Sequence, residues 1–279
     1  MKILVTGGAG FIGSHLVDKL ILDGHDIDVL DDFSTGKNKN SRANYIVEDV
    51  RSDLANLGEY DVIYHLAALA RIQPSFENPM KTIDINVKGT ANLCNYAHKV
   101  NAKFIYAGSS SFYAGPYLNP YAFSKWQGEE VCKMFSSVYG MSSAIARFFN
   151  VYGSRHLCEG PYATVVGIFE RQFLENKALT ITGDGEQRRD FTHVNDIVRG
   201  LILMSEKTWK GDIFNLGTGI NHSINDLANM YNSKKQYISK RPGEAKETLA
   251  DISFSRQNLG YIPSEDIEDY VKEWIKSIK

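Results

Sequence analysis

The chain is poor in cysteine, nearly balanced in charge and free of long apolar runs, and each shortage excludes a class of protein. Its cysteines, Cys94, Cys132 and Cys158, are odd in number and lack the spacing of metal ligands. They argue against a disulfide framework and against a metal site, and they indicate reduced thiols in the cytoplasm. The formal net charge is −2, with Lys and Arg dispersed, so we expect no nucleic-acid partner.

No run reaches the roughly 18 apolar residues of a membrane span, so the sequence predicts a protein without a membrane partner. The first residues hold one Lys and then a Gly-rich apolar run without a cleavage signature, which we interpret as a strand and not as a signal peptide. With 279 residues, 43% of them hydrophobic, the chain can form one sizeable domain and a smaller lobe.

A glycine-rich turn follows the first expected strand. Gly7, Gly10 and Gly13 lie between this strand and a helical segment, where glycines permit a tight turn and close approach to a pyrophosphate. The helix N-terminus adds unpaired N–H groups. The second strand ends in Asp31 and Asp32, where a carboxylate accepts hydrogen bonds from an adenosine ribose and repels a ribose phosphate. The pattern predicts NAD in preference to NADP.

Strand-like and helical segments alternate through the first half of the chain. We expect strands at roughly 2–6, 26–31, 44–48, 61–66, 103–107 and 142–148, and helices at roughly 11–23, 51–57, 79–100 and 120–139. This alternation predicts an α/β fold with a Rossmann-type doubly wound parallel sheet. Residues 1–152 would form the NAD-binding domain, which also receives 187–214. Residues 153–279 would mainly form a smaller C-terminal α/β substrate lobe, closed by a helix capped by Ser264.

Tyr121 and Lys125 are spaced to share one face of a helix. The pKa of a free Tyr is about 10, and lowering it to ~7 costs about 4 kcal/mol. A cation ~6 Å away, at an effective dielectric constant of ~20, supplies roughly 3 kcal/mol. Lys125 therefore nearly suffices, and an oxidised nicotinamide ring would complete the shift. Tyr121 is the candidate base, and the hydroxyls of Ser109, Ser110 and Ser111 lie just upstream.

The sequence resembles the extended short-chain dehydrogenase/reductase family, and within it the nucleotide-sugar 4-epimerases of the UDP-glucose 4-epimerase type. The resemblance runs nearly end to end. The motifs that carry it are Val5-Thr-Gly-Gly-Ala-Gly-Phe-Ile-Gly-Ser-His15, His65-Leu-Ala-Ala68, Asn86-Val-Lys-Gly-Thr90, Tyr121-x-x-x-Lys125, Arg147-Phe-Phe-Asn-Val-Tyr-Gly153, Gly183-Asp-Gly-Glu-Gln-Arg-Arg-Asp-Phe-Thr-His-Val194, Asn215-Leu-Gly-Thr-Gly219 and Arg241-Pro-Gly-Glu-Ala-Lys-Glu-Thr-Leu-Ala-Asp251.

The resemblance implies a role for each matching residue. Tyr121 would remove the sugar hydroxyl proton, Lys125 would bind the nicotinamide ribose, and Ser109 would hydrogen-bond the sugar O4, with Ser110 beside it. NAD, tightly bound and recycled, would also be held by Phe11 and Ile12 in the glycine loop, by Asp49 and Val50 at the adenine, and by Leu66, Ala67, Ala68 and Asn86 along the cleft.

At the substrate end, the resemblance implies that Asn150 contacts the diphosphate and that Arg189 and Arg241 clamp it, a role that suits a guanidinium fork. Arg188 is the alternative to Arg189, and the two could also be a solvated pair. Thr248 matches a position where residue size admits or excludes an N-acetyl group, and a small Thr predicts admission.

Other residues favour structural roles. We interpret His65 as strand-end packing, and Tyr113 and Tyr152 as pocket walls. Asn86 could simply be a buried helix residue.

The expected reaction is inversion at C4 of a UDP-hexose, that is UDP-glucose and UDP-galactose or their N-acetyl forms, through a transient 4-keto sugar. Related dehydratases and decarboxylases typically carry an acid two residues after the catalytic hydroxyl, whereas here Ser111 takes that place. A reductase would favour NADP, against Asp31. A non-catalytic NAD sensor would not need the Ser109, Tyr121 and Lys125 set.

One departure from the family pattern is the link between Tyr113 and Tyr121, which has only seven residues, roughly a dozen fewer than is usual there. We expect it to leave the sugar end of the pocket more open. Relatives commonly dimerise through the helices matching 79–100 and 120–139, so the resemblance also implies a homodimer.

Overall fold

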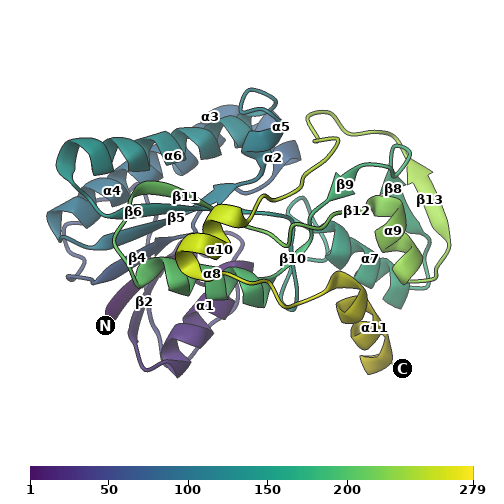
Figure 1. The fold of residues 1–279 in the computed structure, drawn as a ribbon, viewed down its shortest axis with the longest axis horizontal. Coiled ribbons are helices and arrows are strands. Elements are labelled where there is room, and N and C mark those ends of the chain that lie inside the picture. Colours follow the sequence, from purple (N-terminus) through teal and green to yellow (C-terminus); the bar gives the residue numbers. More distant parts are fainter. Residues whose placement is uncertain (279) are drawn as a thin grey trace.

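The computed structural model describes residues 1–278 and is built around one seven-stranded parallel sheet with the order β11-β6-β5-β4-β1-β2-β3 (Figure 1). All six pairings between neighbouring strands are parallel. Its strands are β1 (Lys2–Thr6), β2 (Asp26–Asp31), β3 (Asn44–Val47), β4 (Val62–His65), β5 (Lys103–Ser109), β6 (Ser143–Phe148) and β11 (Lys210–Leu216).

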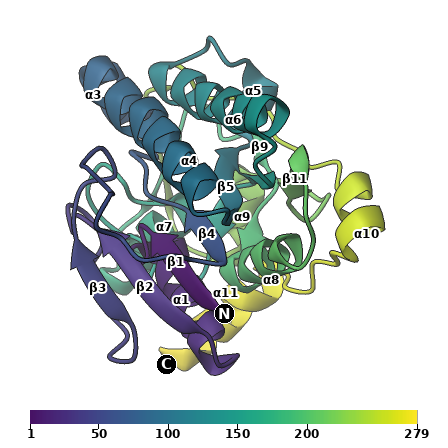
Figure 2. The same ribbon diagram turned by 90° about the vertical axis from the view of Figure 1, so that its left-hand side faces the viewer.

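Helices cover both faces of this sheet, as Figure 2 shows end-on. One layer holds α1 (Phe11–Leu22) and α8 (Val194–Ser205), with α10 (Ser253–Leu259) beside β11. The other holds α2 (Ile72–Glu77), α3 (Pro79–Ile83), the π-helical η1 (Asp84–Lys88), α4 (Gly89–Lys99), α5 (Ser111–Ala114) and α6 (Pro120–Tyr139). The predicted doubly wound α/β fold is confirmed.

The strands divide their side chains between two cores because successive residues point to opposite faces. In β1, Ile3 and Val5 pack with Leu16 of α1 in one core, whereas Leu4 packs with Leu93 of α4 in the other. Burial on both faces is typical of parallel sheets.

A smaller lobe lies beside the sheet (Figure 1). It contains α7 (Val165–Leu174), β8 (Leu179–Thr182), α9 (Ile224–Met230), β13 (Lys235–Ile238) and α11 (Ile267–Ser277). Three short strand pairs complete the fold: β8 with β13, β9 (Arg188–Arg189) with β12 (His222–Ser223), and β7 (Val151–Tyr152) with β10 (Thr192–His193). In the sequence, α8 and β11 lie between segments of the lobe, but in the structure they lie against the main sheet. We therefore propose that the first domain ends at about residue 152 and also receives residues 187–214.

Three local predictions are corrected by the structure. Residues 51–57 form turns and not a helix. The helical region expected at 79–100 is divided into α3, η1 and α4, with the π-helical turn at Asn86. The last helix is capped by Asp266 and not by Ser264, whose N–H and hydroxyl instead donate to the buried carboxylate of Asp196.

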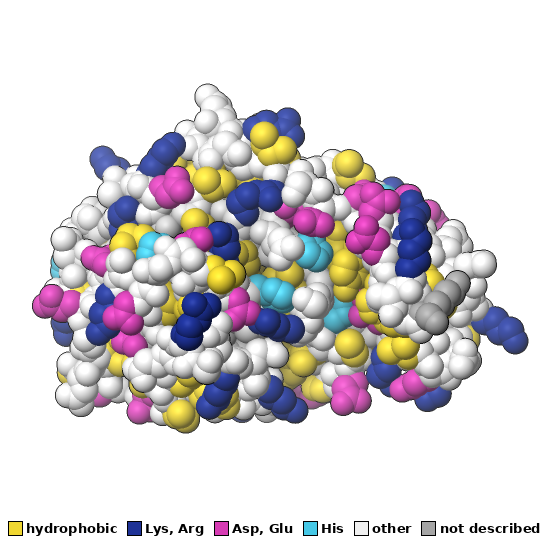
Figure 3. Space-filling view, turned by 90° about the horizontal axis from the view of Figure 1, so that it is seen from below, with side chains coloured by type: hydrophobic (Ala, Val, Ile, Leu, Met, Phe, Trp, Pro, Cys, Tyr) yellow, Lys and Arg dark blue, Asp and Glu magenta, His cyan; other side chains and the backbone are white. Residues whose placement is uncertain are grey.

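The surface carries no dominant charge on the face seen from below, where Lys and Arg are interspersed with Asp and Glu (Figure 3). None of the helices within residues 1–278 has both the length and the apolar character needed to cross a bilayer. The three cysteines are free thiols.

Candidate active site

The glycine loop lies where the strand order reverses, since β1 pairs with β2 on one side and β4 on the other, and ligands bind at such switch points. Gly7 has φ +70°, and a Cβ there would lie 2.7 Å from the backbone N of Ala67. A Cβ on Gly13 would lie 2.2 Å from the carbonyl O of Gly7. Only glycine permits this close packing, which places the N-terminus of α1 at the pocket.

Asp31 holds the glycine loop in place as well as facing the cofactor pocket. Its carboxylate accepts hydrogen bonds from the N–H of Ala9 at 2.9 Å and of Phe33 at 2.9 Å. Burial raises the pKa of Asp31, and these two bonds act in the opposite direction. Each carboxylate oxygen has a further lone pair for a ribose hydroxyl.

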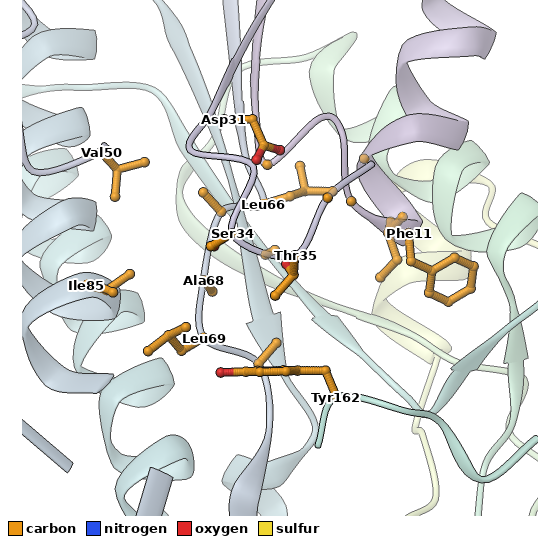
Figure 4. Close-up of a pocket in the computed structure, with 18 of the residues that line it drawn as sticks. Phe11, Asp31, Ser34, Thr35, Val50, Leu66, Ala68, Leu69, Ile85 and Tyr162 are labelled. Atoms are coloured by element: carbon orange, nitrogen blue, oxygen red, sulfur yellow. The ribbon is translucent and has the colours of Figure 1, made fainter. Parts of the chain in front are cut away.

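The cofactor pocket brings together every residue predicted to contact NAD except Asn86. Figure 4 shows Val50, Ile85 and Leu69 on one side, Phe11 on the other, and the ring of Tyr162 at one end. The predicted residues that line it are Gly7, Gly10, Phe11, Ile12, Gly13, Asp31, Asp32, Asp49, Val50, Leu66, Ala67, Ala68, Tyr121 and Lys125. A helix N-terminus at one point and an acid at the end of β2 fit the pyrophosphate and ribose of NAD.

Asn86 supports the pocket wall from behind. Its side-chain oxygen accepts from the N–H of Leu69 at 2.8 Å, and its amide donates to the hydroxyl of Ser124 at 2.9 Å and the carbonyl of Leu69 at 3.1 Å. It joins the loop after β4 to α6.

His65 is the centre of a buried chain of hydrogen bonds and not a reacting group. The hydroxyl of Thr90 donates to the carbonyl of Asn86, so its oxygen accepts a hydrogen bond from Nε2–H of His65. Nδ1 of His65 is then unprotonated and accepts from the hydroxyl of Thr6 at 2.7 Å. The structure thereby assigns His65 the packing role expected from the sequence. Burial, with a smaller contribution from Lys125, lowers the pKa of His65 to about 3.

The depressed pKa of His65 predicts acid-sensitive stability. Below about pH 6.5 His65 binds a proton in the unfolded chain, whereas in the folded chain it binds one only near pH 3. The free energy of unfolding should therefore fall with decreasing pH across this window, by up to about 1.4 kcal/mol per pH unit from this residue. Urea unfolding from pH 7 to pH 4.5 should show a shallower pH slope for His65→Asn than for the wild type. The exposed His98 offers the control, because His98→Asn should keep the wild-type slope; equal slopes for His65→Asn and wild type would contradict the assignment.

The candidate base and its hydroxyl partner meet between the sheet and α6. Tyr121 donates its hydroxyl to Oγ of Ser109 at 3.2 Å, and Ser111 donates to the same oxygen at 2.9 Å. Asn119 caps α6 by accepting from the N–H of Ala122, and this fixes Tyr121 in the first turn.

Lys125 lies one turn after Tyr121, as the spacing predicts, but its ammonium sits 4.3 Å from the centre of the Tyr106 ring. Lys125 is 4% exposed, and burial lowers its pKa to about 8. Burial raises the pKa of Tyr121, whereas the Ser109 hydrogen bond and the charge of Arg71 lower it, against the charge of Glu129.

Arg71 is the residue that the sequence analysis missed. It lies in the loop after β4, directly before α2, and lines both the cofactor pocket and the neighbouring substrate pocket. A sequence signal existed, because Arg71 is the single charge ending the apolar run Leu66–Ala70.

The substrate pocket shares Tyr121 with the cofactor pocket and extends into the lobe. The predicted residues that line it are Ser109, Ser110, Tyr121, Asn150, Arg189, Arg241 and Thr248. Asn150 donates its amide to the hydroxyl of Thr248 at 2.9 Å.

The structure separates the two neighbouring arginines of β9. Arg189 lines the pocket, with its side chain 12% exposed and 4.0 Å from Glu244. Arg188 donates from Nε and Nη2 to the side chain and carbonyl of Asn221, outside the residues that line the pocket. Tyr113 and Tyr152 are also absent from both sets of lining residues, so their interpretation as pocket walls is wrong: Tyr113 is 51% exposed and Tyr152 is fully buried.

A loop of the lobe lies across the sugar end, where the short link before Tyr121 was expected to leave the pocket open. Asn119 donates to the carbonyl of Gly243 at 3.1 Å, and Gln73 donates to the carbonyl of Pro242 at 3.0 Å. The loop around Pro242 is therefore tied to α2 and to the residue that caps α6.

Comparison with curated proteins identifies relatives along the full chain. The chain is 36% identical to a putative UDP-glucose 4-epimerase of Methanocaldococcus jannaschii, over 99% of this chain and 98% of that protein. It is 33% identical to UDP-glucuronic acid decarboxylase 1 of Danio rerio, over 99% of this chain and 72% of that protein.

Solved structures agree with these relatives. The UDP-glucose 4-epimerase of Thermotoga maritima, solved with UDP-glucose, matches with a TM-score of 0.94 and 31% identity over 100% of this chain and 99% of that one. The UDP-glucuronic acid 4-epimerase of Bacillus cereus, solved with UDP-glucuronic acid and NAD, matches with a TM-score of 0.90 and 31% identity over the whole of both chains.

The model of the NAD dependent epimerase/dehydratase family matches residues 3–217, and the chain belongs to this family. It is an enzyme of the NAD-dependent UDP-sugar epimerase and decarboxylase group, and NAD is its cofactor.

Proposed function

We propose that this enzyme inverts C4 of UDP-hexoses through a transient 4-keto sugar. The observation that carries the proposal is that the lining of the substrate pocket has no carboxylate beside the base. Among the described residues lining the substrate pocket, Glu244 is the only acid, and it lies 4.0 Å from Arg189. Next to Ser109 and Tyr121 the chain has Ser111, which cannot act as the acid or base for loss of water.

Each residue in the pocket has a part in this reaction. Tyr121 takes the proton of the sugar O4, and Ser109, which already contacts the Tyr121 hydroxyl, orients that oxygen. NAD, held at the glycine loop and Asp31, would supply reversible hydride transfer at C4. Arg189 and Arg241 hold the diphosphate while the 4-keto sugar turns over in the pocket, and Tyr121 then returns its proton to the opposite epimer.

Decarboxylation of a UDP-uronic acid is the alternative within the family, because decarboxylases are among the relatives. It is disfavoured by the same missing acid. A non-catalytic NAD sensor is disfavoured by the contact between Tyr121 and Ser109 at the wall between the two pockets.

The experiment is to incubate the purified enzyme with UDP-glucose, UDP-galactose, UDP-N-acetylglucosamine and UDP-glucuronic acid and to follow the sugar protons by NMR. We expect C4 epimers without loss of carbon, and NAD released only on denaturation. Formation of UDP-pentose or of a 4-keto-6-deoxy sugar as the sole product would contradict the proposal.

The small side chain of Thr248 predicts which neutral sugars the pocket accepts. Its side chain lines the pocket beside Asn150, and its small size should admit an N-acetyl group. The wild type should therefore convert UDP-N-acetylgalactosamine as well as UDP-galactose, and Thr248→Tyr should lower kcat/KM for the acetylated sugar at least about tenfold more than for UDP-galactose. UDP-galactose in the same variant is the control. A wild type that converts only UDP-galactose would show the prediction to be wrong.

We also propose a homodimer through the layer that contains α3, α4 and α6. Met80, Met134, Val138 and Tyr139 on these helices are exposed apolar side chains, and burying them between two copies would remove them from water. Sedimentation equilibrium should give twice the chain mass, and a monomer at micromolar concentration would contradict this.

A further inference from the structure

Arg71 carries a partly buried positive charge without an acidic partner. Its Nε donates to the carbonyl of Tyr162 at 2.9 Å, and its Nη1 donates to the carbonyl of Ala70 at 3.3 Å. Within residues 1–278, no Asp or Glu lies within ion-pair distance of it. Burial lowers the pKa of Arg71, and the groups that oppose this are the hydroxyls of Tyr121 and Tyr162, not a carboxylate. A desolvated charge of this kind is costly unless an anion pairs with it.

The position of Arg71 indicates which anion could pair with its charge. Eight of the described residues line both pockets, Tyr121 among them, and Arg71 is the only charged one of the eight. The pyrophosphate of NAD belongs at the glycine loop and the N-terminus of α1. The diphosphate of the substrate belongs at Arg189 and Arg241, which line the substrate pocket alone. Arg71 is therefore a third cation, placed at the base and hence at the sugar.

We propose that Arg71 pairs with a carboxylate on the sugar, so that UDP-hexuronic acids are the preferred substrates of this enzyme. The inference rests on the proposed 4-epimerase function, and it names the substrate class. In a hexuronic acid the C6 carboxylate is bonded to C5, the neighbour of C4, and so lies close to the oxygen that Tyr121 deprotonates. A guanidinium offers two parallel N–H donors to a carboxylate, and the Nη2 group of Arg71 has no hydrogen-bond acceptor within the described residues.

The test compares UDP-glucuronic acid with UDP-glucose in the NAD-loaded enzyme. The wild type should have a kcat/KM for UDP-glucuronic acid at least about tenfold higher. Arg71→Met should lower both values, because the Arg71 charge also favours the ionised form of Tyr121. The loss for the uronic acid should exceed the loss for UDP-glucose by at least about tenfold and should appear mainly in KM. Arg71→Lys should restore part of it.

Arg188→Met is the matched control, because Arg188 is the arginine next to Arg189, binds Asn221, lies 3.6 Å from Asp226 and does not line either pocket. It should leave the ratio of the two kcat/KM values unchanged. NAD content is measured in every variant by release on denaturation.

Other outcomes separate this inference from the proposed function. Equal losses for both sugars in Arg71→Met would overturn it, since Arg71 would then act only through Tyr121. Loss of NAD from the variant would also overturn it, in favour of a cofactor contact. A 4-keto hexuronic acid is a β-keto acid that can lose CO2, so UDP-pentose formed in an Arg71-dependent manner would support carboxylate recognition while contradicting epimerisation. If no UDP-sugar is converted, the proposed function fails, and calorimetric binding of UDP-glucuronic acid and UDP-glucose to wild type and Arg71→Met still decides the role of Arg71.

Discussion

Replacing Tyr121 with Phe should lower kcat for UDP-sugar epimerisation by about three orders of magnitude, the scale expected when a positioned acid–base group is removed. The KM for the sugar nucleotide should change little, because Arg189 and Arg241 still hold the diphosphate. The variant should also keep its NAD, since its ring still separates the two pockets. Turnover is followed by NMR and cofactor content by release on denaturation.

Tyr113→Phe is the matched control for this experiment. Tyr113 precedes Tyr121 by one short loop, but its hydroxyl donates to Asn215 at 2.8 Å, and the residue is 51% exposed and lies outside both pockets. It should retain a kcat close to the wild-type value. Unchanged turnover in Tyr121→Phe would remove the proposed mechanism, and a collapse in Tyr113→Phe would show that the assignment of the base is wrong.

Replacing Arg147 with Met should lower the free energy of unfolding by about 3–5 kcal/mol, because it leaves a buried carboxylate without its cation. Arg147 donates from Nε and Nη2 to Glu129, with a closest approach of 2.6 Å. Both side chains are at most 5% exposed. The melting temperature should fall by roughly 10 °C. Urea unfolding and thermal melting of the NAD-loaded protein provide the two measurements.

Two controls define this prediction. Lys133 and Glu130 form an ion pair 2.8 Å apart on the exposed side of α6, the helix that carries Glu129. Lys133→Ala should lower the free energy of unfolding by less than about 1 kcal/mol. The double variant Glu129→Met with Arg147→Met should recover much of the loss, because no buried charge is then left alone. A loss from Arg147→Met no larger than that from Lys133→Ala would contradict the importance of burial.

Features that depend on neighbouring residues in the chain could be predicted from the sequence. The glycine turn between β1 and α1 and the acid at the end of β2 follow local patterns of the nucleotide-binding unit. The spacing of Tyr121 and Lys125 follows from the period of a helix. The strand boundaries were predicted within about two residues for the same reason, because buried parallel strands are short apolar runs with clear ends.

Features that depend on distant partners could not be predicted. Asp196 lies about 70 residues before Ser264 in the chain and takes the hydrogen bonds that would have made Ser264 a cap. Arg188 donates to Asn221 and so lies outside the pocket, although the neighbouring Arg189 has the same side chain and lines it. The importance of Arg71 appears only when the fold brings the loop after β4 to Tyr121.

The two hydrogen bonds of the Pro242 loop predict that ligands exchange differently in the two pockets. Asn119 and Gln73, which hold this loop, line the substrate pocket but not the cofactor pocket. Breaking these two contacts exposes the sugar end while leaving the contacts of the glycine loop and Asp31 in place. We therefore expect sugar nucleotides to enter and leave many times during the residence of one NAD molecule, so that the cofactor would not have to be rebound in each turnover.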